Sequence, residues 1–173
     1  DGMYKGNTKD NLLDTSHWHQ LNTTVYTALT DFAGSLIGLK AKESVYSINT
    51  TDGTATMLRK GPIHFMHSTD GRLIAGNKTN VFVYHSLTDF ISLTLDGTVT
   101  YLTADGDTYW SCNGTGGLNG YQYNKESKSV TRTVTSIIPN SPIRNHCQYM
   151  HFVDDERLLI AGGGINHLDN TFF

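Results

Sequence analysis

The sequence predicts an all-β fold made of β-propeller blades, each a sheet of four antiparallel strands, on the basis of three observations. Short apolar strands recur at similar spacing, Asp-Gly turns separate them, and no window of ten or more residues has helical apolar spacing without a glycine or β-branched interruption. The composition agrees, since 38% of the 173 residues are hydrophobic, 17% are charged and 17 are glycine. This balance is typical of many short strands joined by turns.

One strand recurs four times. Each copy begins at a turn residue or a charge and ends in small residues, and the copies are Gly34–Leu39, Gly71–Gly76, Asp107–Cys112 and Glu156–Gly162. Ile37 to Ile74 is 37 positions and Ile74 to Ser111 is another 37, whereas Ser111 to Ile160 is 49. The spacing predicts a structural repeat with an insertion in its last interval.

Three further strands complete the repeated unit. A second strand follows each copy after a short turn, at Ser44–Asn49, Asn80–His85, Gly117–Tyr123 and Ile165–Leu168. Threonine-rich strands come next at Thr54–Leu58 and Val130–Val134, and alternation in the latter places Val130, Arg132 and Val134 on one face. An upstream strand precedes each unit, at Val25–Leu29, Ile63–His67, Val99–Leu102 and Tyr149–Val153. Four strands in about 37 to 49 residues are typical of a propeller blade.

Turn chemistry supports this interpretation. Aspartate-glycine pairs lie between the predicted strands at Asp52–Gly53, Asp70–Gly71, Asp96–Gly97 and Asp105–Gly106. Hairpin turns require positive φ, which Asp-Gly adopts at low cost. A Greek-key sandwich would also use short strands, but it would not explain the equal steps of the repeat.

The blades form one partial propeller domain over residues 1–173. We place about 3.5 to 4 blades in the chain, near 18–58, 61–95, 97–135 and 147–173, with an inter-blade insertion at 136–146. Closed propellers usually have four to eight blades, and an open stack exposes an apolar face and unpaired edges. We therefore expect the chain to associate with the rest of a parent propeller or with another copy of itself.

Charge and hydropathy argue against several other functions. The net charge is −3 and the lysines and arginines are scattered singly, which argues against nucleic acid as a partner. The longest apolar stretches, such as Leu158–Ala161, are far too short for a transmembrane helix. The polar start of the chain carries no signal region, which fits either a removed signal or a cytosolic protein. Cys112 and Cys147 are interpreted as two buried free thiols in preference to a bridge, and the redox compartment stays open.

Several segments together resemble a known family. They are Trp18, Tyr26–Leu39, Tyr109–Leu118 with its Gly116-Gly117 pair, the insertion Ile138–Asn145, and Arg157–Gly164. These segments resemble the PorZ-like proteins of type IX secretion, among the large Bacteroidetes propellers with two-component-regulator-type repeats. The resemblance covers most of residues 18–164, although Ser141 stands where the family pattern has glycine.

The resemblance implies a bacterial protein of the periplasm or the cell surface, associated with the outer membrane. Its chain would contribute to an amino-terminal, seven-bladed propeller that helps attach or modify secreted cargo. We expect a non-catalytic scaffold that binds a protein or a glycan. The alternatives are a periplasmic ligand-sensing propeller of a hybrid two-component system and, third, a propeller hydrolase or lyase.

No motif for catalysis, a metal or a cofactor stands out. The sequence lacks a nucleophile elbow and a phosphate loop, and the carboxylates at Asp105, Asp107 and 154–156 do not follow a calcium-loop pattern. His17 and His19 would share one face of a strand, but no third ligand is nearby in sequence. We therefore expect no enzyme activity, no metal and no cofactor.

Two groups of residues are the candidates for binding. The aromatic residues Trp18, Tyr109 and Trp110 are of the type that stacks on sugars or anchors partners, although such residues in blades also pack between sheets. Asn140, Arg144 and Asn145 belong to the proline-containing insertion, which is either a loop with a specific role or a brace between blades.

Overall fold

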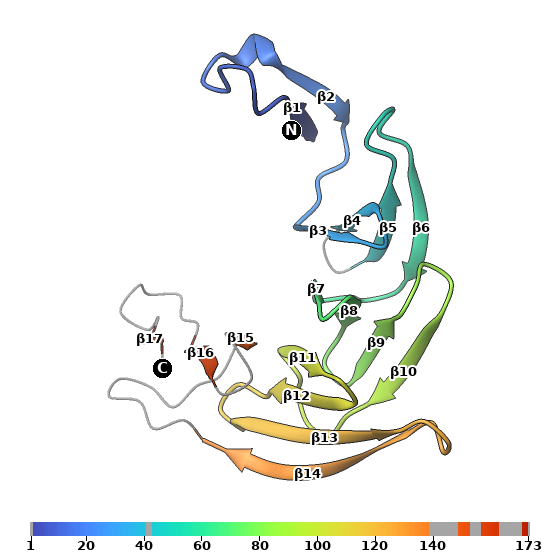
Figure 1. Cartoon of the computed structure of the whole chain (residues 1–173), viewed down its shortest axis with the longest axis vertical. Coiled ribbons are helices and arrows are strands. Elements are labelled where there is room, and N and C mark those ends of the chain that lie inside the picture. Colours follow the sequence, from blue (N-terminus) through green and yellow to red (C-terminus); the bar gives the residue numbers. More distant parts are fainter. Residues whose placement is uncertain (1, 41–42, 139–148, 153–156, 163–170, 173) are drawn as a thin grey trace.

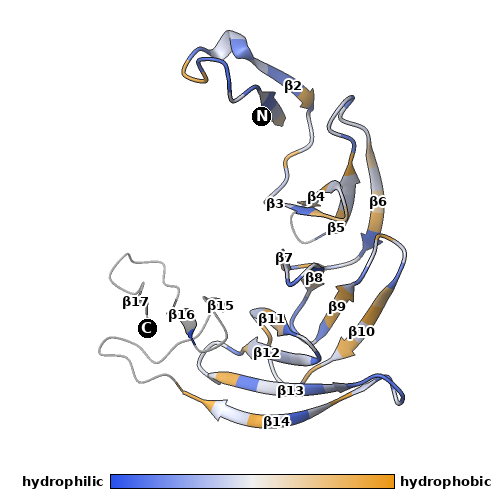
Figure 2. Cartoon of the chain, viewed as in Figure 1, coloured by the Kyte–Doolittle hydropathy of each residue, from blue (hydrophilic) through white to orange (hydrophobic). Residues whose placement is uncertain are grey.

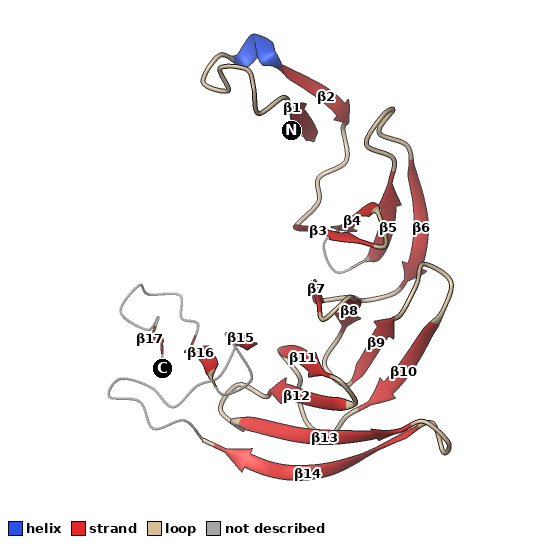
Figure 3. Ribbon diagram, viewed as in Figure 1, coloured by secondary structure: helices blue, strands red, loops and turns tan. Residues whose placement is uncertain are grey.

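The computed structural model describes residues 2–40, 43–138, 149–152, 157–162 and 171–172. These residues form antiparallel strands, with one short turn of 3-10 helix, η1, at Thr15–His17 (Figure 3). The predicted all-β fold of four-stranded blades is confirmed.

Three complete sheets occupy the middle of the chain, and each runs in sequence order from its first to its fourth strand. Blade 1 consists of β3 (Ala28–Phe32), β4 (Ser35–Lys40), β5 (Ser44–Ile48) and β6 (Ala55–Lys60). Blade 2 consists of β7 (Phe65–Thr69), β8 (Arg72–Gly76), β9 (Asn80–Tyr84) and β10 (Phe90–Thr94). Blade 3 consists of β11 (Tyr101–Asp105), β12 (Thr108–Cys112), β13 (Leu118–Asn124) and β14 (Ser129–Ile137).

A smaller sheet lies at each end of this series. The amino-terminal hairpin pairs β1 (Met3–Gly6) with β2 (Trp18–Asn22). The carboxy-terminal sheet pairs β15 (Tyr149–Phe152) with β16 (Leu158–Gly162), which pairs in turn with β17 (Thr171–Phe172).

The sheets follow one another along an open arc (Figure 1). The first strands of successive sheets, β3, β7, β11 and β15, lie on the inner side of the arc and contact one another in order. The fourth strands, β6, β10 and β14, lie on the outer side (Figure 1). This is the radial arrangement expected of propeller blades.

A repeated backbone hydrogen bond defines the structural period. The residue just before each first strand donates its N–H to the carbonyl of the last or next-to-last residue of the second strand. The pairs are Thr27 to Leu39 at 2.8 Å, His64 to Gly76 at 2.7 Å and Thr100 to Cys112 at 2.8 Å. The acceptors are 37 and then 36 positions apart. The predicted second step of 37 is therefore wrong by one residue, because Trp110 rather than Ser111 stands third in its strand, as Ile74 does in β8.

Apolar side chains are buried between the blades rather than within one sheet. One cluster joins blades 1 and 2 through residues such as Ile37, Ile63 and Leu73. A second joins blades 2 and 3, and a third places Met150 of the carboxy-terminal sheet against blade 3. Figure 2 shows the corresponding pattern, with hydrophobic residues in the strands and a hydrophilic tip on the β13–β14 hairpin. Each blade therefore depends on its neighbours to bury its faces.

Several expected boundaries shift in the structure. The first strand of each complete blade begins two or three residues later than predicted, since the predicted strands included connecting residues such as Ile63 and Val99. These two side chains are buried, so their apolar character reflects packing between blades. Asp96–Gly97 is not a hairpin turn, because it lies in the connection from β10 to β11. The predicted strand Ile165–Leu168 lies outside the described residues.

Two further expectations differ from the structure. Residues 18–22 belong to the amino-terminal hairpin rather than to blade 1, because β2 pairs with β1. The prediction of two free thiols is wrong for Cys112, which is buried and disulfide-bonded. The one other cysteine of the sequence, Cys147, lies outside the described residues. Among the residues that the structure describes, no helix is long and apolar enough to cross a membrane.

Candidate functional site

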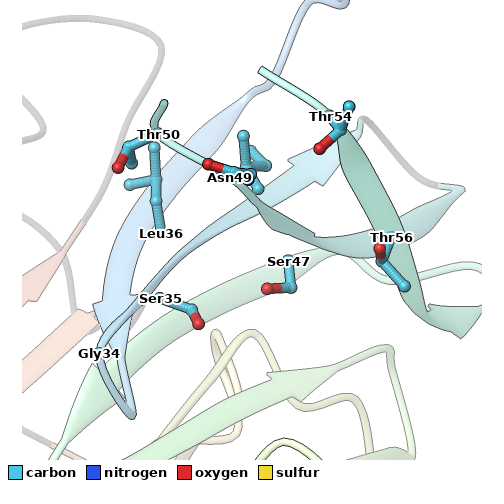
Figure 4. A pocket seen from close by; sticks show the side chains of 9 residues that line it. Gly34, Ser35, Leu36, Ser47, Asn49, Thr50, Thr54 and Thr56 are labelled. Carbon is cyan, nitrogen blue, oxygen red and sulfur yellow. The ribbon is translucent and has the colours of Figure 1, made fainter. Parts of the chain in front are cut away.

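A polar pocket of about 400 Å³ lies at one end of blade 1 and is the candidate functional site. It is formed by the β3–β4 turn, the adjoining strands and the β5–β6 loop, and Figure 4 shows its lining. The lining residues are small, are apolar or bear a hydroxyl or amide group, and they comprise Gly34, Ser35, Leu36, Ser47, Ile48, Asn49, Thr50, Thr54 and Thr56. None of these side chains is charged, so the pocket suits an uncharged polar ligand.

The strand register sets the hydroxyl groups of the pocket. Ser35, Ser47 and Thr56 come from three successive strands, β4, β5 and β6, and lie along one side of the pocket (Figure 4). Ser47 and Thr56 stand directly opposite each other in the β5–β6 ladder. Because a hydroxyl can both donate and accept a hydrogen bond, this row can match the alternating donors and acceptors of a sugar or a polypeptide backbone.

The β5–β6 loop forms the other side of the pocket and is fixed by its own hydrogen bonds. Asn49 accepts the N–H of Gly53 at its carbonyl and the N–H of Thr51 at Oδ1, both at 2.8 Å. Asp52 Oδ1 accepts the backbone N–H of Thr54 at 2.9 Å and its hydroxyl at 2.7 Å. These bonds from Thr54 hold the pKa of the Asp52 carboxyl below its usual range. The loop is therefore preorganised without a ligand.

A second hollow, of about 670 Å³, lies against the amino-terminal hairpin. Lys5, Asp10, His17 and His19 are among its lining residues. The two histidines do not share one face of a strand as predicted, because His17 ends η1 and only His19 lies in β2. His17 Nδ1 is 2.9 Å from the carbonyl oxygen of Asn11. Within the described part of the chain, no group of three or more His, Cys, Asp or Glu side chains could hold a metal ion.

The three aromatic candidates do not come together. Trp18 packs across Gly6 on the hairpin, and its indole N–H donates to the carbonyl of Leu12 at 2.9 Å. Tyr109 lies in the core between blades 2 and 3, where burial raises the pKa of its hydroxyl. Trp110, its neighbour on β12, is half-buried against the cluster around Cys112 on the other side of blade 3. In this structure all three rings contribute to packing.

The remaining candidates, Asn140, Arg144 and Asn145, lie outside the described residues, so their binding role stays a prediction. The hydroxyls of the pocket were missed because single serines and threonines are common throughout the chain. Ser35 lies between the exposed Gly34 and the half-buried Leu36, and Ser47 lies between the half-buried Tyr46 and the buried Ile48, so neither position stood out in the sequence.

Comparison with known proteins bears on the fold. No family model matches the chain, and no curated protein matches its sequence. Among solved structures, 31 chains match. One is PorZ, described as an essential bacterial surface component of the type IX secretion system of Porphyromonas gingivalis, with a TM-score of 0.63 and 19% identity over 94% of this chain.

The fold is similar to part of PorZ. The match covers 22% of the PorZ chain, so this chain corresponds to a minor part of that protein. A second similar structure is the computationally designed Ika4 protein, with a TM-score of 0.57 and 16% identity, covering 88% of this chain and 91% of that one. At these identities the similarity concerns the fold alone, which fits the predicted PorZ-like propeller only coarsely.

Proposed function

We propose that this chain is a non-catalytic scaffold of the bacterial envelope or cell surface that binds a neutral glycan through the pocket of blade 1. The uncharged, hydroxyl-lined pocket is the observation that carries the proposal. Its serines, threonines and asparagine offer hydrogen bonds to sugar hydroxyls, while the half-buried Leu36 offers apolar contact to the sugar ring.

Two further observations support the cellular setting. The fold resembles a portion of PorZ, which is a bacterial surface component. Cys112 is disulfide-bonded, and disulfides persist mainly in oxidising compartments such as the periplasm and the cell surface. A scaffold role in type IX secretion is the finer form of this proposal.

The composition of the pocket also supports binding in preference to catalysis. General acid–base catalysis of glycoside cleavage requires a pair of carboxyl groups beside the scissile bond. The pocket lining provides hydroxyl and amide groups instead, and the carboxylate of the β5–β6 loop, Asp52, is exposed and engaged with Thr54.

A glycan array followed by calorimetry with the selected oligosaccharide tests the proposal. The variant Thr56→Trp should fill the pocket from an exposed strand position and weaken binding about tenfold or more. Thr131→Trp is the matched control, because Thr131 is an exposed threonine on the fourth strand of blade 3 and does not line the pocket. An array without neutral glycan ligands, or equal binding by Thr56→Trp and wild type, would contradict the proposal.

A further inference from the structure

The β5–β6 loop has a hollow on each of its two sides. Thr50 lines the pocket of blade 1, and the next residue, Thr51, lines the second hollow against the amino-terminal hairpin. Since consecutive Cα atoms are about 3.8 Å apart, only the loop itself separates the two spaces. Asn49, Thr50 and Thr51 are all exposed, so the crest of the loop between the hollows is open to solvent.

Two hydrogen bonds fix the hairpin beside this loop. Lys5 Nζ donates to the carbonyl of Thr50 at 3.1 Å, and Asn22 Nδ2 donates to the carbonyl of Gly53 at 3.0 Å. Figure 1 shows the resulting arrangement, in which the end of β2 lies next to the β5–β6 loop. The wall between the two hollows is therefore held by the hairpin as well as by the bonds within the loop, and its shape does not depend on a ligand.

The second hollow offers charged hydrogen-bonding groups in addition to hydroxyls. Lys5 and Asp10 are among its lining residues. An ammonium group has three N–H donors, so Lys5 keeps two beyond its bond to Thr50, and the Asp10 carboxylate is an acceptor. Hydrogen bonds between a charged group and a hydroxyl are stronger than those between neutral groups. Because the two charges are opposite, the second hollow suits a neutral ligand that is rich in hydroxyl groups.

His17 adds a further acceptor to the second hollow. Its Nδ1 lies close to the carbonyl oxygen of Asn11, and because a carbonyl oxygen only accepts hydrogen bonds, Nδ1 carries the proton. The neutral ring therefore leaves Nε2 as an acceptor. Thr8 and Thr51 contribute hydroxyl groups from the hairpin and from the loop, so both walls of the hollow can bond to a sugar.

We propose that the two hollows bind one extended, neutral oligosaccharide that crosses the β5–β6 loop, with one end in the pocket of blade 1 and the other in the second hollow. This inference rests on the proposed function and adds the class of ligand, which is a linear chain of several sugar units instead of a single sugar. Once the first units occupy the pocket, the rest of the chain meets the second hollow at a high effective concentration. Long chains therefore bind more tightly than short ones.

Calorimetry with malto-, cello-, manno- and xylo-oligosaccharides of increasing length, together with the parent monosaccharides, tests this proposal. In the series that binds, chains of about four to six units should bind about tenfold or more tightly than the monosaccharide and the disaccharide. The gain should level off once the chain is long enough to occupy both hollows, because further units have no more of the site to contact.

Two variants fill the second hollow from opposite walls. Thr51→Trp does so from the loop and Thr8→Trp from the hairpin, and both threonines are exposed. Each variant should lower the affinity for long chains to that for short chains and leave the affinity for short chains unchanged, whereas Thr56→Trp should weaken the binding of both. Thr131→Trp is again the matched control, because Thr131 lines neither hollow. Circular dichroism checks that each variant remains folded.

The outcomes separate this inference from the proposed function. If no chain of any length binds, both are overturned. Binding that does not increase with chain length would overturn the extended site alone and leave the pocket of blade 1 as a glycan site. A loss of long-chain affinity with Thr51→Trp but not with Thr8→Trp would also overturn the extended site, because the effect would then come from the loop and not from the second hollow.

Discussion

Neutral His67 at the contact between blades 2 and 3 should make folding stability depend on pH. Its ring lies nearly parallel to that of Tyr101, at an interplanar angle of 10°, and also stacks near Phe65. Both ring nitrogens are buried and lack a hydrogen-bond partner with good geometry, although the residue as a whole keeps some exposure. Burial lowers the pKa of His67 from 6.5 to about 4, and the nearby backbone of Leu102 opposes part of this change.

The sign and size of the effect follow from the lowered pKa. Since the folded-state pKa is lower than the unfolded-state pKa, the unfolded chain binds the extra proton between pH 6.5 and about 4. Stability is therefore fully present above pH 6.5 and falls as the pH decreases to about 4. Because a tenfold difference in proton affinity corresponds to about 1.4 kcal/mol, the total loss is on the order of 3 kcal/mol.

The variant His67→Phe isolates this contribution, because phenylalanine keeps a planar ring for stacking and cannot take up a proton. Urea unfolding followed by tryptophan fluorescence would give the free energy of unfolding of both proteins at about pH 7.5 and about pH 4.5. Wild type should lose about 2 kcal/mol more than the variant between these pH values. The exposed His64, substituted in the same way, is the control and should keep the wild-type pH dependence. Equal pH dependence of wild type and His67→Phe would refute the reasoning.

Three further predictions concern Arg59, Gly53 and Cys112. The Arg59 guanidinium lies 3.8 Å from the ring centroid of Phe82, and its Nε donates to the Tyr84 hydroxyl at 2.6 Å. Arg59→Ala should therefore lower the free energy of unfolding by about 2 kcal/mol, and Arg59→Lys should recover little of that loss because lysine lacks the planar group. Thermal melts of both variants measure these effects. Gly53 has a φ of +75°, and a Cβ there would clash with the backbone carbonyl oxygen of Leu21 in β2. Gly53→Ala should therefore cost about 2 kcal/mol more than Gly34→Ala, because Gly34 has a similar φ of +74° but open space around it. Similar losses of the two variants in urea unfolding would argue against this contact. Reductant should destabilise wild type by about 3 kcal/mol and leave Cys112→Ser unaffected, and equal sensitivity of the two would contradict a stabilising disulfide.

The fold class could be predicted from the sequence because blade periodicity is a local property. Each strand carries its own apolar pattern, and Asp70–Gly71 supplies the positive φ values, 48° and 64°, that its hairpin requires. The strand starts were less predictable, since Ile63 and Val99 are apolar for packing between blades and lie just before the strands. Periodicity alone does not distinguish an apolar residue within a strand from an apolar residue in a connection that packs between blades.

Whether Cys112 is a free thiol or part of a disulfide could not be predicted without the folded structure. Two cysteines 35 positions apart give no indication from spacing alone whether they meet, because pairing depends on Cβ positions fixed by the fold. The prediction of free thiols followed the general preference of cysteine for buried positions, and Cys112 is indeed fully buried while being disulfide-bonded.

The sequence by itself determined the repeat and the order of strands within each blade, because both depend on residue type and spacing along the chain. Tertiary structure alone decided that Tyr109 is a core residue while Leu29 is half exposed, because burial depends on whether another sheet stands opposite. It also decided the pocket, since Ser35, Ser47 and Thr56 are brought together by the β4–β5–β6 register and not by proximity in sequence.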